Sequence, residues 1–125
     1  MFSHVMVGAN DIEASKKFYD ATLGALGYGP GTTDPNGRVF YITETGIFAI
    51  SKPIDGNPAC HGNGSTIGFA APSPEAAQAW HDAGVANGGS SCEEPPGIRS
   101  GAMGDLFLAY LRDPAGNKVC ALLRM

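Results

Sequence analysis

The side chain best placed for chemistry in this chain is His4, in the first segment with a regular pattern. Residues 3–9 alternate as a strand with two different environments does. Val5 and Val7 share one face, and a helix should pack on it. His4 and Met6 then lie on the opposite face. An imidazole there can ligate a metal ion or act as a general base near neutral pH.

The pattern of the strand that carries His4 is repeated 62 residues later, where Thr66 stands at the position equivalent to His4. The same shift relates Phe18-Tyr19 to Trp80-His81 on the helices that follow. Two strand-helix units with one spacing predict a duplicated module. We therefore expect one domain, residues 1–125, made of modules of about 1–57 and 58–125. The Thr66 hydroxyl ionises too weakly to replace an imidazole ligand.

The remaining pattern predicts two helices and a series of short strands. Asn10 is expected to cap the first helix, and Ser73 with Pro74 to begin the second. Strands are predicted near 38–43, 47–52, 65–71, 90–94, 105–112 and 118–124, with a loop at 95–104 and a turn at Asp113. The residues predicted to face the core from the helices are Phe18 in the first and Ala76, Ala79, Trp80 and Ala83 in the second, whereas His81 is predicted on the helix surface.

Composition excludes several classes of partner. The net charge is −4, and the longest basic cluster is the pair Lys16-Lys17, so we expect no nucleic-acid or anionic-membrane partner. No apolar run approaches membrane-spanning length and the first residues do not resemble a signal peptide, so we expect a cytoplasmic protein. Three widely spaced cysteines without a C-x-x-C indicate neither a disulfide framework nor a zinc knuckle.

Two motifs, together with the duplicated order, carry a family resemblance over the whole chain. One is the stretch Asn63-Gly64-Ser65-Thr66-Ile67-Gly68-Phe69-Ala70-Ala71-Pro72-Ser73, and the other is the turn Asp113-Pro114-Ala115-Gly116-Asn117. The chain resembles the glyoxalase/bleomycin-resistance/dioxygenase superfamily, also called vicinal oxygen chelate proteins. The resemblance implies an α+β fold in which two βαβββ modules form a curved, mostly antiparallel, cup-like sheet with the helices outside, and it implies a homodimer.

The resemblance also implies where a divalent metal would be bound. His4 matches one usual histidine ligand, whereas Thr66 stands at the second histidine position and Cys120 at that of the closing carboxylate. Cys120 could ligate as a thiolate, and a third ligand would have to come from His61 or Glu44. The alternative is a metal-free His4 that lines a pocket, and a Cys120 that is a small buried hydrophobic residue.

The function predicted from these residues is a diverged member of the family with a small-molecule pocket on the concave sheet face. The predicted substrate contacts are Met6, Phe48, Thr66, Arg99, Tyr110 and Leu122, with His4 as the catalytic candidate and His4 and Cys120 as the metal candidates. Arg99 and Arg38 are the candidates for holding an anionic group. We expect a metal-poor binding protein or diverged enzyme without a cofactor. The alternative is a glyoxalase-like lyase or dioxygenase using zinc, nickel, manganese or iron.

Overall fold

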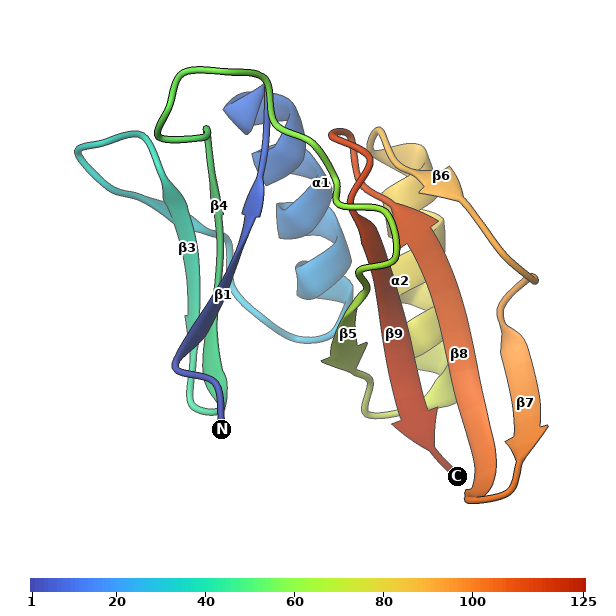
Figure 1. The fold of residues 1–125 in the computed structure, drawn as a ribbon. Helices are drawn as coiled ribbons and strands as arrows, with labels where there is room; N and C mark the ends of the chain where they lie inside the picture. Colours follow the sequence, from blue (N-terminus) through green and yellow to red (C-terminus); the bar gives the residue numbers. More distant parts are fainter.

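The computed structural model describes residues 1–125, which form two helices and nine strands (Figure 1). The elements of the first module are β1 (His4–Gly8), α1 (Ile12–Ala25), β2 (Thr32–Thr33), β3 (Val39–Thr43) and β4 (Gly46–Ser51). Those of the second module are β5 (Ile67–Ala70), α2 (Pro74–Ala86), β6 (Ser90–Ser91), β7 (Gly97–Gly101), β8 (Gly104–Arg112) and β9 (Lys118–Arg124).

The strands form one mixed sheet in each module. The first sheet has the order β1-β4-β3-β2 and the second β5-β9-β8-β6, with β7 also paired to β8. In each sheet the opening strand pairs in parallel with the last one, β1 with β4 and β5 with β9, and the other pairs are antiparallel. The predicted α+β fold with a duplicated module is confirmed. The two sheets stay unclosed, and no ladder of hydrogen bonds joins them.

The spacing of 62 residues recurs in the helix starts. The N-cap of α1 is Asp11, whose side chain accepts a hydrogen bond from the Ala14 N–H at 3.0 Å, and the N-cap of α2 is Ser73. The prediction of Asn10 as the first cap was wrong by one residue. Its side chain instead accepts a hydrogen bond at 2.7 Å from the Ala59 N–H, in the segment that links the modules.

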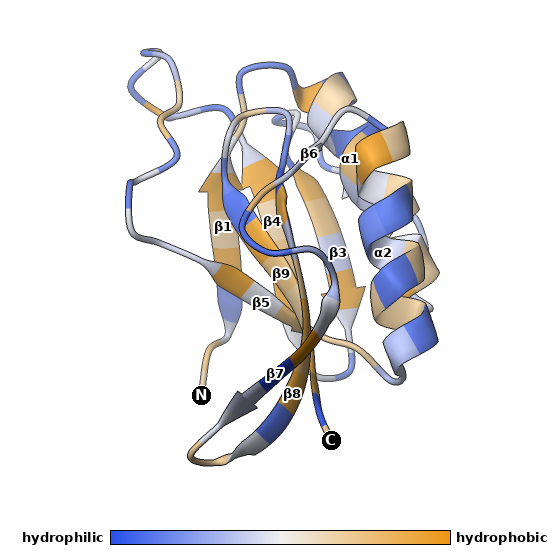
Figure 2. Cartoon of the chain, turned by 90° about the vertical axis from the view of Figure 1, so that its right-hand side faces the viewer, coloured by the Kyte–Doolittle hydropathy of each residue, from blue (hydrophilic) through white to orange (hydrophobic).

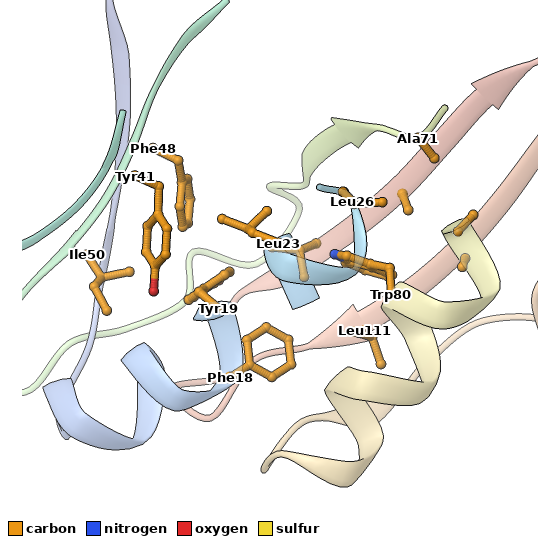
Figure 3. Packing of buried hydrophobic residues seen from close by; sticks show 14 of the residues in the cluster. Phe18, Tyr19, Leu23, Leu26, Tyr41, Phe48, Ile50, Ala71, Trp80 and Leu111 are labelled. Atoms are coloured by element: carbon orange, nitrogen blue, oxygen red, sulfur yellow. The ribbon is translucent and has the colours of Figure 1, made fainter. Parts of the chain in front are cut away.

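A single core is shared by both modules (Figure 3). Fifteen buried residues form it, and they come from both helices and both sheets. Phe18 and Trp80 are fully buried, as predicted. Figure 2 shows hydrophobic residues concentrated in the strands, whereas the helices alternate hydrophobic and hydrophilic residues. Because Val7 packs against this core, His4 and Met6 lie on the outer face of their sheet, the face turned away from the core.

Two predictions about the second module were wrong. The buried side of α2 consists of Ala77, Trp80, His81 and Gly84, so the predicted stripe was displaced by about one residue and His81 is not a surface residue. The predicted loop at 95–104 contains β7, which pairs with β8 through five residue pairs. Its sequence, Gly-Ile-Arg-Ser-Gly, has little intrinsic strand preference, so pairing with the long neighbour β8 decides its conformation.

Candidate functional site

A mainly apolar pocket of about 330 Å³ lies where the edge strands of the two sheets, β1 and β5, come next to each other. Eleven of its sixteen lining residues are hydrophobic. They include Phe2, Val5, Leu23, Tyr28, Tyr41, Phe48, Ile67 and Phe69, and His4, Gly68 and Ala70 complete the wall on the outer-face side. The volume is at the lower end of the range for small-molecule sites.

The pocket exists because β1 and β5 do not pair with each other. Each of them has one hydrogen-bonded neighbour, β4 or β9, so the backbone N–H and C=O groups along its other side have no partner in a sheet. Apolar side chains therefore provide the walls, and backbone donors and acceptors are available at the opening. This combination suits a ligand that is mostly apolar with a few polar atoms.

His4, which the sequence predicts as a site residue, lines this pocket in the structure. It is exposed, and its Nδ1 lies 2.8 Å from the Ser3 hydroxyl, which fixes one side of the ring. Phe48 also lines the pocket, but it is 7% exposed and belongs mainly to the core. Its ring contacts those of Tyr19 and Phe69, with centroids 4.7 and 5.1 Å away.

Met6 and Thr66 lie outside this pocket. Met6 is 40% exposed and lines a wider, open cleft of about 1500 Å³, to which Arg38 also contributes. The Arg38 guanidinium is already paired with the Asp34 carboxylate at 2.8 Å, which accounts for its charge. Thr66 is exposed and directly precedes β5.

The outer face of the second sheet brings the other predicted residues together. Tyr110 and Cys120 are directly opposite each other on β8 and β9, and Leu122 is on the same face as Cys120. Arg99 reaches this face from β7, where it is paired with Leu106, and its guanidinium donates to the Pro95 carbonyl at 2.8 Å. These residues belong to the second sheet, and none of them lines the pocket that His4 lines.

Lys118 is a residue of this face that the sequence reasoning missed. Its ammonium group is 5.0 Å from the centre of the Tyr110 ring and forms an ion pair with Glu93. This pairing raises the pKa of Lys118. The alternation of β9 was the available signal, because it places Lys118, Cys120 and Leu122 on one face.

The residues predicted to hold a metal do not fit a metal centre within one chain. No three His, Cys, Asp or Glu side chains, whether or not they include His4 or Cys120, come together in an arrangement able to hold a metal ion. Burial raises the pKa of the Cys120 thiol, which disfavours the thiolate that a metal would need. His61 lies against Gly116, in the turn between β8 and β9.

Comparisons with known proteins agree with this fold. The family model described as Glyoxalase/Bleomycin resistance protein/Dioxygenase superfamily matches residues 1–121, and the chain belongs to this superfamily. No curated protein matches the chain.

No helix has both the length and the apolar character needed to cross a membrane.

Among solved structures, a glyoxalase/bleomycin resistance protein from Albidiferax ferrireducens T118 is 66% identical, with a TM-score of 0.96 and coverage of 99% of both chains. A family enzyme from Burkholderia phytofirmans PsJN is 16% identical, with a TM-score of 0.75 and coverage of 98% of both chains. A glyoxalase-related enzyme from Fulvimarina pelagi is 18% identical, with a TM-score of 0.73 and coverage of 98% of this chain and 86% of that one. The last two show the fold alone.

Proposed function

We propose that this protein binds a small, mostly apolar molecule in the pocket between β1 and β5, and that it does so without a metal. The pocket itself is the observation that carries the proposal: it has about 330 Å³ of space, mainly hydrophobic walls and one imidazole, that of His4. The donor set supports the metal-free part, because His4 does not belong to any group of three or more His, Cys, Asp or Glu side chains able to hold a metal ion.

The polar groups at the opening define the ligand further. His4 can donate or accept one hydrogen bond, and the free edges of β1 and β5 supply backbone donors and acceptors. No Lys or Arg side chain lines this pocket. We therefore propose an uncharged ligand with one or two oxygen atoms rather than a carboxylate or phosphate.

The proposal is tested with a library of uncharged aromatic and aliphatic carbonyl compounds, using the melting temperature as the readout. A compound that binds only the folded state at about 100 times its Kd adds about 2.7 kcal/mol of stability. Ala70→Leu fills the pocket and should abolish the shift. Ala79→Leu, at an exposed position of α2, is the matched control. Shifts that persist in Ala70→Leu would place the ligand elsewhere.

The metal-free part has its own test. Zinc, nickel, manganese or iron should leave the melting temperature unchanged, because a site that binds only the folded state must stabilise it. Stabilisation by a metal that is lost in His4→Ala and kept in His61→Ala would overturn this part. It would favour the alternative, a metal-dependent glyoxalase-like lyase or dioxygenase.

We also propose that the protein is a homodimer. Met6 and Ile42, on the outer face of the first sheet, are 40% and 71% exposed, and a second copy could cover them. Light scattering during gel filtration measures the mass directly. A monomer at micromolar concentration would contradict this proposal without affecting the pocket.

A further inference from the structure

A histidine and a serine form a close pair on the far side of the second module from the pocket. His81 Nε2, on α2, is 2.9 Å from the Ser91 hydroxyl oxygen, on β6. The second ring nitrogen of His81, Nδ1, is 4.0 Å from a carboxylate oxygen of Asp82. The same oxygen of Asp82 accepts a hydrogen bond from the Gln78 side chain at 3.0 Å, which restrains the carboxylate.

The His81 side chain is buried, as suits a general base, whereas Ser91 is exposed, as suits a nucleophile that must reach a substrate. The His81 side chain is 11% exposed, and its burial lowers its pKa, so the ring is neutral at neutral pH. Ser91 is exposed, at the edge of its sheet. A neutral imidazole within hydrogen-bond reach of a serine hydroxyl is the arrangement that activates serine as a nucleophile.

The fold explains why the pair forms. Ser91 is paired with Leu111, a core residue, so its side chain points toward the α2 side of the sheet, whereas Ser90 is paired with Arg112 and points the other way. Ser90 and Ser91 are therefore neighbours in one strand with different surroundings. Only Ser91 meets an imidazole.

We propose that Ser91 and His81 are a nucleophile and its general base, and that they react with small activated esters. The Ser91 oxygen would attack the ester carbonyl carbon while its proton passes to His81 Nε2. The bond to the alcohol breaks, and the alcohol leaves with that proton, so that an acyl-serine and a neutral His81 remain. Water then attacks the acyl group, gives a proton to His81, and releases the acid as Ser91 recovers its proton.

The experiment uses 4-nitrophenyl acetate, with release of nitrophenolate as the rate and mass spectrometry to locate the acetyl group. We expect acetylation at Ser91, a rate about 100-fold lower in Ser91→Ala, and an unchanged rate in Ser90→Ala. His81→Gln keeps a hydrogen-bonding side chain but removes the base, and it should lose activity to the same extent while remaining folded by circular dichroism.

Two results would overturn the proposal. One is an unchanged rate in Ser91→Ala, and the other is acetyl groups found only on lysines or on Cys60 and Cys92. If His81→Gln does not fold, the comparison of the two serine variants still decides. Both serines are exposed, and neither belongs to the core.

Discussion

The two modules place the same elements at the same spacing but give different tasks to equivalent side chains. Tyr19 and His81 occupy the same position of α1 and α2, and both are buried. The Tyr19 hydroxyl donates to Asp113 of the second module, whereas His81 pairs with Ser91 within its own module. The order and spacing of the helices and strands are therefore repeated in the two modules, whereas the polar contacts of equivalent side chains differ.

The same contrast holds where the helices meet. Thr22 and Gly84 are equivalent positions, and the side chain of Thr22 packs closely beside Gly84. A bulky residue on one helix is thus matched by an absent side chain on the other. The duplicated helices can pack together because their sequences differ at the contact.

The largest difference between the modules should appear in their hairpin turns. Asp113 is 5% exposed, and its carboxylate accepts hydrogen bonds from Tyr19 at 2.6 Å and from the Asn117 side chain at 2.9 Å. Asp113→Ala leaves the buried Tyr19 hydroxyl without a partner and removes one of the two acceptors of the Asn117 side chain, which also donates to the Gly8 carbonyl at 2.9 Å. The free energy of unfolding should therefore fall by about 3 kcal/mol. Thr43, the half-buried last residue of β3, donates its hydroxyl to the Gly46 carbonyl at 2.8 Å across the turn of the first module, and Thr43→Ala should cost about 0.5–1 kcal/mol. Urea unfolding measures both, and equal losses would refute the contrast.

A second comparison concerns two helical glycines. A Cβ on Gly84 would lie 2.3 Å from Leu111 Cδ1 and 3.0 Å from Phe18 Cε2, and both side chains are fully buried. Gly84→Ala should therefore destabilise the protein by about 1–3 kcal/mol. Gly24 has nothing within 4 Å of the same atom. Gly24→Ala should stabilise the protein by about 0.5–1 kcal/mol, because alanine favours a helix more than glycine does. A loss of stability in Gly24→Ala would contradict the open space around this position.

The third comparison is the pH dependence of the two buried helix positions. Burial lowers the pKa of His81, so the unfolded chain binds more protons below about pH 6.5 and stability falls as the pH drops through that range. Burial and the nearby Asp113 raise the pKa of Tyr19, so its contribution is complete below about pH 10 and is lost as the pH rises further.

His81→Gln should therefore flatten the acid side of the stability profile, and Tyr19→Phe should flatten part of the alkaline side. Tyr41 keeps the rest of the alkaline dependence, because its pKa is also raised by burial. Urea unfolding at about pH 5, 7 and 10.5 measures the profile. An acid side that is unchanged in His81→Gln would mean that other groups control it.

Sequence patterns predicted the features that depend on local spacing. The shift of 62 residues and the buried Phe18 and Trp80 follow from periodicity, and the Ser73 cap follows from a serine directly before Pro74. Features set by contacts between distant segments were missed. β7 depends on pairing with β8, and Asp113, predicted as a turn residue, also holds Tyr19, which is 94 positions away. Of the residues predicted for a site, His4 and Phe48 line the pocket, whereas Arg99, Tyr110 and Leu122 lie on the second sheet, and their roles stay predictions.

The smallest expected effect distinguishes two roles for Cys120. In the repeat of strand pairing, Cys120 beside Gly68 corresponds to Ala49 beside Met6, and both Cys120 and Ala49 are buried. An alanine is thus accepted at this position in the first module, and Cys120→Ala should change the free energy of unfolding by about 1 kcal/mol or less.

Reaction with a thiol reagent at about pH 8 completes this test. Cys60 is exposed, whereas burial both hides the Cys120 thiol and raises its pKa. Cys60 should therefore react fast and Cys120 slowly, because the thiolate is the reactive form. The double variant Cys60→Ser/Cys92→Ser leaves Cys120 as the one thiol and isolates its slow reaction. If Cys120 reacted as fast as Cys60, a role as a ligand or nucleophile would have to replace its role as a packed hydrophobic side chain.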